Sequence, residues 1–270
     1  MSNIIHPTVV IEDGAQIGNG VSIGPYCVIG ANVVLKDNVT LKSHVVVDGH
    51  TTIGQGTVVY PFASLGTAPQ DLKYAGEKST LIIGENNTIR EHVTMNPGTE
   101  ANGRMETRVG NNCLFMMAAH VAHDCVIGNN VILANNATLA GHVSVGDFAI
   151  IGGLSAVHQF SRIGEHAMIG GMSGVENDVI PYGLVKGERA SLHGLNIIGM
   201  KRRGFDNNDV RALQRAYGDL FSDEGTFDAR VNKVSNDYAN ESSVAKLIEF
   251  TQGESKMPLC QPHKASMPKQ

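Results

Sequence analysis

Histidines gather in the middle of this chain. Four of the eleven histidines, His120, His123, His142 and His158, lie close together in the sequence. An imidazole with an ordinary pKa of about 6.5 can accept a proton at neutral pH, which suits it to general-base catalysis. Asp124 follows His123 directly, and a carboxylate that holds one ring nitrogen fixes the tautomer and strengthens the other nitrogen as a base. The residue types therefore predict general-base chemistry centred on this pair.

The elements that must position these side chains follow from a repeat. Every sixth residue from Ile5 to Leu65 is a branched aliphatic residue, and an apolar residue at the same spacing returns at Ile83 and continues to Val175. A period of six fits neither an α-helix nor a plain alternating strand. It is typical of a solenoid of short strands and turns, in which two residues of each hexad point inward.

The repeat predicts a solenoid over residues 1–188. Two segments interrupt it, 66–80 and 96–107, and the second shifts the phase of the repeat as an insertion would. We expect both segments to be loops that leave the solenoid. Loops on a rigid scaffold are favoured places for binding residues, so these two segments are candidates for part of the site.

A helical pattern replaces the repeat over residues 189–253. Residues that can cap helices stand at Asp206, Thr226 and Ser242 or Ser243, and they predict three helices. The last segment, 254–270, contains few apolar residues and is expected to be disordered. The sequence therefore predicts a mainly β solenoid followed by an α-helical C-terminal domain.

Composition narrows the class of function. The net charge is −5 and no long basic stripe is present, which argues against a nucleic-acid partner. The sequence contains no apolar run long enough to span a membrane, and its first residues lack the pattern of a signal peptide, so we expect a cytoplasmic protein. The four cysteines lack zinc-finger spacing, and three of them fall at inward positions where a reduced thiol acts as a small apolar residue.

Many hexads contain an aliphatic residue followed by glycine, as at Ile17-Gly18 and Ile127-Gly128. In this feature the chain resembles the hexapeptide-repeat acyltransferases. The resemblance implies a left-handed parallel β-helix with three hexads, or about 18 residues, in each coil. The spacing of the repeat alone does not determine the handedness.

A coil of that length places the candidate residues in columns. His123, Gly141 and Gln159 form one column, and Asp124 and His142 stand in the next. A glycine beside the base lets a backbone N–H approach the negative charge that develops on an oxyanion. The first column contains neither serine nor cysteine, so direct attack by the acceptor is favoured over a covalent acyl-enzyme.

Five stretches make the resemblance more specific. They are QDLKYAGE (70–77), AHVAHDC (119–125), LANNATLAGHV (133–143), AVHQF (156–160) and GMKRRGF (199–205). Over about residues 5–250 the chain resembles the UDP-N-acetylglucosamine acyltransferases of lipid A biosynthesis. This resemblance implies transfer of an (R)-3-hydroxyacyl group from acyl carrier protein to the glucosamine 3-hydroxyl of UDP-N-acetylglucosamine (UDP-GlcNAc), the first step of that pathway. It implies no cofactor, because the donor is the acyl group on the 4′-phosphopantetheine of the carrier protein.

The resemblance also implies a role for each matching residue. His123 is the general base, Asp124 its polarising partner and Gly141 the donor of the oxyanion N–H. The implied substrate-binding residues are Asp71, Lys73, His120, His142, His158, Gln159, Gly171, Asn196, Arg202 and Arg203. Among them, the last three would hold the uridine and the diphosphate, and Gly171 would leave room for a long acyl chain. Homotrimers are implied as well, with sites between the subunits.

Other readings remain open on the sequence. A different hexapeptide acyltransferase, either an N-acyltransferase or an acetyltransferase that uses coenzyme A, would share the solenoid. A scaffold without catalysis or a zinc-binding solenoid would explain the histidines differently, although Asp124 beside His123 favours base chemistry and no metal. The chain departs from the family pattern at Asn96-Pro97 and at Arg189. The acyl length, and the choice between a 3-hydroxyl and a 3-amino acceptor, do not follow from the sequence.

Overall fold

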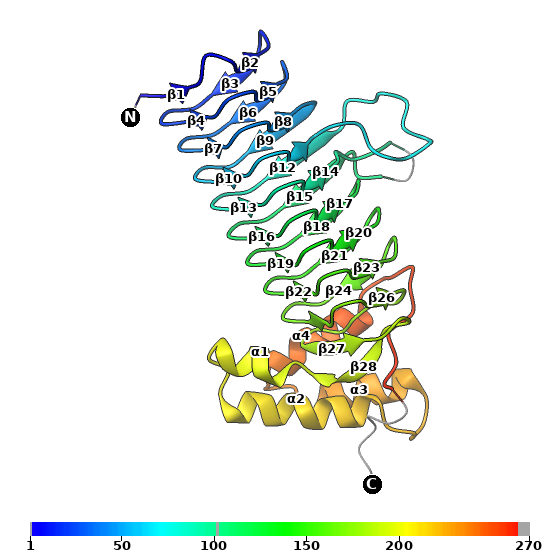
Figure 1. The fold of residues 1–270 in the computed structure, drawn as a ribbon. Coiled ribbons are helices and arrows are strands. Elements are labelled where there is room, and N and C mark those ends of the chain that lie inside the picture. Colours follow the sequence, from blue (N-terminus) through cyan, green and yellow to red (C-terminus); the bar gives the residue numbers. More distant parts are fainter. Residues whose placement is uncertain (1, 101–102, 264–270) are drawn as a thin grey trace.

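A parallel β-helix makes up most of the molecule (Figure 1). The computed structural model describes residues 2–100 and 103–263. Within them the chain winds through three sheets in turn, and each strand from β1 to β27 pairs in parallel with a strand one coil away. His120 is opposite Thr138 in this register, for example, and Val121 is opposite Leu139. The coil length implied by the resemblance is therefore the observed one over this part of the chain.

The bounds of the strands show the repeat. Sheet A contains β1 (Ile4–Ile5), β4 (Ser22–Ile23), β7 (Thr40–Leu41), β10 (Val58–Val59), β13 (Thr88–Ile89), β16 (Leu114–Phe115), β19 (Ile132–Leu133), β22 (Ile150–Ile151), β25 (Met168–Ile169), β27 (Gly183–Lys186) and β28 (Ser191–Leu195). Sheet B contains β2 (Val10–Ile11), β5 (Val28–Ile29), β8 (Val46–Val47), β11 (Ser64–Leu65), β14 (Thr94–Met95), β17 (His120–Val121), β20 (Thr138–Leu139), β23 (Ala156–Val157) and β26 (Gly174–Val175). Sheet C contains β3 (Gln16–Ile17), β6 (Val34–Leu35), β9 (His50–Ile53), β12 (Thr80–Ile83), β15 (Glu106–Val109), β18 (Val126–Ile127), β21 (Ser144–Val145) and β24 (Arg162–Ile163).

Aliphatic side chains fill the interior of the prism. In most of these strands the second residue points inward, and Ile29, Leu65 and Leu139 are completely buried. Small residues two positions earlier, such as Cys27 and Ala137, are also completely buried and fill the space at the corners. Burial of each such aliphatic side chain contributes about 1.5–3 kcal/mol, so the periodic core is what holds the coils together.

The corners of the prism require a left-handed backbone. Many corner residues have positive φ values near 60°, and asparagine, which tolerates this conformation, occupies several of them, for example Asn38 and Asn130. Asp124, His142 and Phe160 occupy the same position in three successive coils, with φ values of 60°, 63° and 67°. The fold thus places two candidate site residues and an aromatic ring one above another at one corner.

A helical domain closes the C-terminal end of the prism. It contains α1 (Ile197–Arg202), α2 (Asn207–Leu220), α3 (Phe227–Asp237) and α4 (Ser242–Gln252). Asp206 and Thr226 cap α2 and α3 with their side chains. Two expectations differ from the structure. Helix α4 follows Glu241, so Ser242 is its first residue rather than its cap, and the short helix α1 was not expected.

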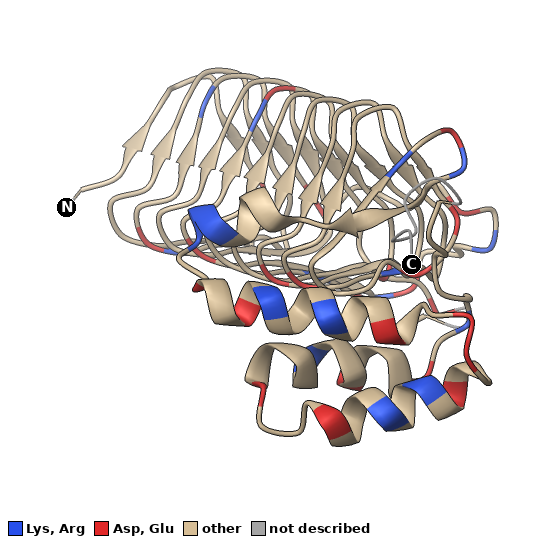
Figure 2. Ribbon diagram, turned by 90° about the horizontal axis from the view of Figure 1, so that it is seen from below, with Lys and Arg blue, Asp and Glu red and all other residues tan. Residues whose placement is uncertain are grey.

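The edges of the segments also differ slightly from the sequence expectation. Strand β28 lies after residue 188, because it pairs antiparallel with β27 and extends sheet A to Leu195. Strand β12 begins at Thr80 and β15 at Glu106, so the two loops end just before these residues. Figure 2 shows that charged residues are spaced along the helices, whereas the strands carry few of them.

The expectation that residues 254–270 are disordered is wrong for 254–263. Leu259 forms a bridge to Asp178, and Pro262 forms one to Leu192. Cys260 is buried, and its burial gives this polar segment an apolar anchor that its composition did not reveal. Residues 264–270 lie outside the described residues. In the part of the chain that the structure describes, no helix has the length and apolar character needed to span a membrane.

Candidate active site

Most of the candidate residues lie along one edge of the prism, where sheet B turns into sheet C. The turns 122–125, 140–143 and 158–161 follow β17, β20 and β23 at this edge. The two loops arise at the same corner in the two preceding coils, the first between β11 and β12 and the second between β14 and β15. Successive coils stack in register, so loops and turns far apart in the sequence become neighbours. We call these turns and loops together the histidine edge.

His123 and Asp124 form the centre of the histidine edge. Nδ1 of His123 lies 2.8 Å from Oδ2 of Asp124, whose side chain is completely buried. Burial alone would raise the pKa of Asp124. Hydrogen bonds from His123 and from Thr99 and Arg104 of the second loop outweigh burial and hold that pKa below its ordinary value. Asp124 is therefore an ionised acceptor, His123 carries its proton on Nδ1, and Nε2 can act as a base.

The hydrogen bonds around Asp124 come mostly from the second loop. Thr99 donates to Oδ2 from its backbone N–H at 3.0 Å and from its hydroxyl at 2.7 Å. The backbone N–H of Arg104 donates to Oδ1 at 2.7 Å. Neither residue is among those that the sequence pattern or the family resemblance implies. The only signal was their position in an interrupting loop, because two of these three donors are backbone N–H groups, which almost any residue can supply.

The two loops also hold each other in place. The Asn96 side-chain amide donates to the carbonyl oxygens of Thr67 at 2.9 Å and Ala68 at 3.2 Å, and the Glu100 N–H donates to the Glu77 carboxylate at 3.0 Å. Asn96, one of the departures from the family pattern, thus joins the loops.

Asp71, from the first loop, has its Oδ2 3.7 Å from Nε2 of His123. The first loop therefore brings a second carboxylate to the reactive nitrogen. Lys73 lies two residues further along the same loop and is exposed.

Gly141 provides the space that the His123 ring occupies. A Cβ on this residue would lie 2.5 Å from Cε1 and 2.6 Å from Nε2 of the ring. Real Cβ atoms essentially never show contacts this short, because the optimal separation of non-bonded carbon atoms is about 3.5–4.0 Å. Among the described residues, none accepts a hydrogen bond from the Gly141 N–H. Gly141 therefore leaves space for the His123 ring and places a backbone N–H, which has no acceptor among the described residues, beside that ring.

Two further histidines surround the base. The rings of His123 and His142 meet edge to face with centroids 5.0 Å apart, and His142 stacks on Phe160 at 4.4 Å. Nδ1 of His120 lies 2.7 Å from the Thr94 hydroxyl. Burial is the main cause that lowers the pKa of both His120 and His142. Both rings are therefore neutral at neutral pH and can act as hydrogen-bonding partners.

A metal site at this cluster is disfavoured by its hydrogen bonds. His123, Asp124 and His142 bring ligand atoms within 4.8 Å of one another. However, Oδ2 of Asp124, the oxygen nearest to both imidazoles, already accepts three hydrogen bonds, two from Thr99 and one from His123. A carboxylate oxygen in this state has no lone pair free for a metal ion. The geometry fits a base held by a carboxylate.

Several known proteins are similar to this chain in sequence. Residues 178–260 match the family described as Udp N-acetylglucosamine O-acyltransferase, Domain 2, and residues 4–37 and 106–141 match the bacterial transferase hexapeptide family. A protein of Rickettsia canadensis (strain McKiel) is named acyl-(acyl-carrier-protein)–UDP-N-acetylglucosamine O-acyltransferase. It is 56% identical to this chain over 96% of this chain and 98% of its own length.

This chain belongs to the UDP-N-acetylglucosamine O-acyltransferase family.

Two further members support the same conclusion. A protein of the same name from Azorhizobium caulinodans is 52% identical over 96% of this chain and 95% of its own length. The solved structure of UDP-N-acetylglucosamine acyltransferase from Campylobacter jejuni is 42% identical, with a TM-score of 0.88 over 96% of this chain and 100% of that one. The predicted fold class, a left-handed parallel β-helix with a C-terminal α-helical domain, is confirmed.

Some residues that the family resemblance implies lie near His123, and others do not. His158 and Gln159 are exposed in the turn 158–161 of the histidine edge, two coils beyond His123, and His158 Nδ1 lies 3.1 Å from the Gln159 carbonyl oxygen. Gly171 lies in the turn between sheets A and B, after β25. The structure therefore places His158 and Gln159 on the same edge as the base within one chain of this acyltransferase but leaves Gly171 on another edge.

Asn196, Arg202 and Arg203 lie at α1, beside the corner between sheets C and A. Asn196 caps α1 by accepting from Gly199 N–H and donates to the His166 carbonyl. Arg203 donates to the Phe148 carbonyl at 2.8 Å, and its other terminal nitrogen has no partner among the described residues. Arg202 is exposed. One chain of this acyltransferase does not bring these residues to His123.

Proposed function

We propose that this chain transfers an (R)-3-hydroxyacyl group from acyl carrier protein to the 3-hydroxyl of UDP-GlcNAc, the first step of lipid A biosynthesis. The observation that carries the proposal is the hydrogen bond between the partly exposed His123 and the buried Asp124 at the edge of the solenoid. The relatives' names supply the substrate classes, an acyl carrier protein donor and a UDP-GlcNAc acceptor. The names of the relatives therefore support the substrate classes, and the hydrogen bond between His123 and Asp124 supports general-base catalysis.

In this reaction Nε2 of His123 takes the proton of the 3-hydroxyl. The sugar oxygen then attacks the thioester carbonyl carbon, a C–O bond forms, and the negative charge moves to the carbonyl oxygen. The Gly141 N–H donates to that oxyanion. The intermediate collapses by breaking the C–S bond, and the departing thiolate of phosphopantetheine takes the proton from His123. The atoms balance between the two substrates, so we propose that no cofactor or metal takes part.

The other residues of the histidine edge bind and orient the substrates in this proposal. Asp71, 3.7 Å from the base, accepts from the sugar, and Lys73 of the same loop binds the sugar or its new acyl group. His120 and His142, neutral through burial, donate to and accept from substrate oxygens. His158 and Gln159, in the turn two coils beyond His123, hold the phosphopantetheine arm.

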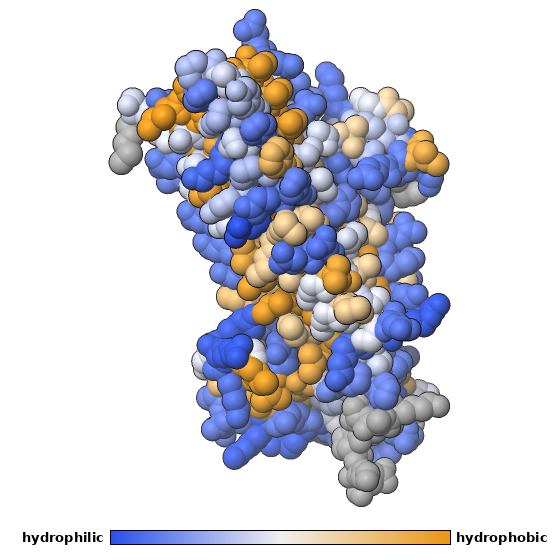
Figure 3. Space-filling view, viewed as in Figure 1, coloured by the Kyte–Doolittle hydropathy of each residue, from blue (hydrophilic) through white to orange (hydrophobic). Residues whose placement is uncertain are grey.

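We propose a homotrimer because the site is incomplete in one chain. Gly171, Asn196, Arg202 and Arg203 lie on other edges of the prism, so only a second copy can bring them to His123. We call the edge where sheet A turns into sheet B the A–B edge. Large apolar side chains are exposed there, including Leu154 at 63% and Met172 at 73%. Figure 3 shows apolar side chains gathered along the visible face of the solenoid, and such patches mark interaction surfaces. Light scattering would test the assembly, and a monomer at assay concentration would refute it.

We place the reaction in the cytoplasm. In the described residues no helix could span a membrane, and the proposed donor and acceptor are both water-soluble conjugates.

The test is an acyl-transfer assay with 3-hydroxyacyl carrier proteins of several chain lengths and UDP-GlcNAc. His123→Ala should lower kcat by at least about 100-fold, because a general base contributes about 10²–10⁴-fold. His50→Ala is a matched control, since His50 lies in β9, three coils away from His123 and off the edge proposed as the interface. Folded wild-type protein that transfers no acyl group to UDP-GlcNAc would refute the proposal. Transfer to the 3-amino sugar instead would assign the chain to a different acceptor.

A further inference from the structure

The C-terminal segment 254–263, which we call the strap, is held firmly against the solenoid. The Asp178 N–H donates to the Pro258 carbonyl at 2.9 Å, and the Cys260 N–H donates to the Asp178 carbonyl at 2.7 Å. Cys260 is 2% exposed, and its thiol donates to the Ala190 carbonyl at 3.0 Å. Because this anchor is buried, the strap residues just before it have a defined position.

The strap reaches the histidine edge through Lys256. Nζ of Lys256 lies 4.1 Å from the centre of the Phe160 ring. Phe160 stacks on His142, and His142 meets His123 edge to face. Contacts therefore run without a break from the strap to the proposed base.

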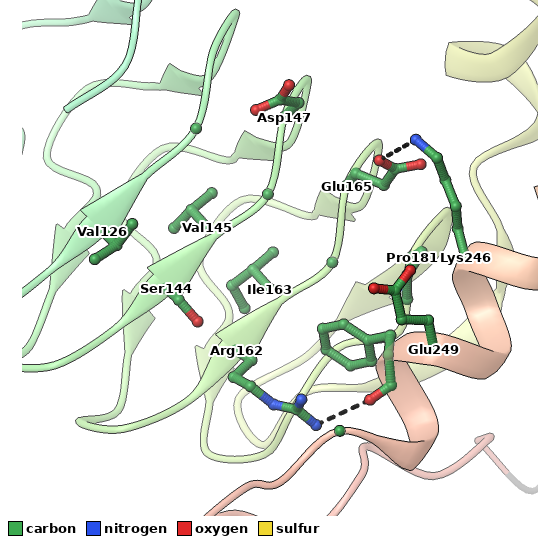
Figure 4. A pocket seen from close by; sticks show the side chains of 15 residues that line it. Val126, Ser144, Val145, Asp147, Arg162, Ile163, Glu165, Pro181, Lys246 and Glu249 are labelled. Atoms are coloured by element: carbon green, nitrogen blue, oxygen red, sulfur yellow. Dashed lines mark hydrogen bonds and ion pairs between the residues drawn. The ribbon is translucent and has the colours of Figure 1, made fainter. Parts of the chain in front are cut away.

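A cavity of about 520 Å³ opens between the strap and the histidine edge. Arg104, His142, Phe160, Arg162, Glu254 and Lys256 are among the residues that line it. Arg162 is already paired, because its Nε lies 2.6 Å from Asp178. It also donates to the Phe250 carbonyl, a bond drawn from Arg162 in Figure 4, which shows an adjoining pocket that shares Ser144 and Arg162 with this cavity. The side chains of Arg104 and Lys256 have no ion-pair partner in the described part of the chain. The cavity therefore presents two unpaired cations beside His142.

We propose that Lys256 of the strap, together with Arg104 of the second loop, binds a phosphate group of a substrate in this cavity. The inference rests on the proposed function, in which both substrates carry phosphate: UDP-GlcNAc a diphosphate and phosphopantetheine a phosphodiester. Ammonium and guanidinium groups form charge-assisted hydrogen bonds with phosphate oxygens. The strap is thus a wall of the active site and contributes a substrate-binding residue.

The experiment compares Lys256→Met with wild type. Methionine keeps an apolar chain against Phe160 and removes the charge. Arg104→Met likewise removes a guanidinium but keeps the backbone N–H that donates to Asp124. Calorimetry gives the Kd for UDP-GlcNAc without turnover, and kinetics give KM and kcat for both substrates. Lys233→Met, on the exposed face of α3, is the matched control, and Lys256→Arg tests rescue.

We expect Lys256→Met to raise the Kd and KM of UDP-GlcNAc about tenfold, the cost of one charge-assisted hydrogen bond at a partly exposed site. We expect kcat to stay within about twofold, because the interaction precedes the chemical step. Inorganic pyrophosphate should compete with UDP-GlcNAc, and less well in the variant. Lys256→Arg should recover most of the binding.

Other outcomes are distinguishable. A rise in KM only for the donor, seen also with acyl-phosphopantetheine that lacks the carrier protein, would assign the bound phosphate to the phosphopantetheine arm. Weaker UDP-GlcNAc binding by Lys256→Met, with a wild type that transfers no acyl group, would keep the phosphate site and refute the proposed reaction. Unchanged Kd and KM values in an active Lys256→Met variant would overturn the inference.

Discussion

Gly141→Ala should remove most of the activity and leave the fold intact. The added Cβ would lie 2.5 Å from Cε1 and 2.6 Å from Nε2 of His123. Carbon atoms in contact stand about 3.5–4.0 Å apart, so the imidazole must move by about 1 Å. That movement disturbs the 2.8 Å hydrogen bond to Asp124 and carries Nε2 away from the acceptor hydroxyl.

A displacement of about 1 Å can lower the rate about 100-fold, which corresponds to about 2.7 kcal/mol of activation free energy. The backbone of Gly141 does not have a positive φ, so alanine adds no backbone strain and the melting temperature should change little. The assay is steady-state acyl transfer with both substrates saturating, beside thermal unfolding of the same samples. Gly218→Ala is the control, because a Cβ there meets no atom within 4 Å. A kcat for Gly141→Ala within about threefold of wild type would refute this account of the ring position.

Three further predictions concern other parts of the molecule. Asp124→Asn should lower kcat by about 100-fold or more, since an amide cannot hold the Nδ1–H tautomer; kcat close to wild type at neutral pH would contradict this role. Burial is the main cause that lowers the pKa of His166. The unfolded state therefore binds more protons as pH falls below about 6.5, and wild type should lose stability there. His166→Phe, which matches Phe148 in the same column, should lose less between pH 8 and pH 5 in urea unfolding, and parallel losses would refute the reasoning. Arg162→Met should cost about 3 kcal/mol of unfolding free energy by leaving the buried Asp178 carboxylate without its ion pair. Adding Asp178→Asn should recover part of that loss, and a deficit unchanged by the second substitution would show that the ion pair is not its cause.

Much of the fold can be predicted from local sequence patterns. The hexad repeat predicts the solenoid because each coil buries the same two positions, and a segment that breaks the repeat must leave the prism. The caps Asp206 and Thr226 predict the starts of α2 and α3 because each makes its hydrogen bonds within one turn. The strap was missed because its order depends on Cys260 entering a pocket formed by distant residues, not on its own composition.

The sequence by itself determined the kind of core, the histidine and aspartate pair and, through resemblance, the class of acyl transfer. Only the tertiary structure decided which residues surround that pair. Thr99 and Arg104 reach Asp124, and Lys256 reaches Phe160, across separations that no local pattern encodes. The physical reason is that hydrogen bonds and ring contacts depend on distance in space, and stacking the coils brings together segments that the sequence keeps apart.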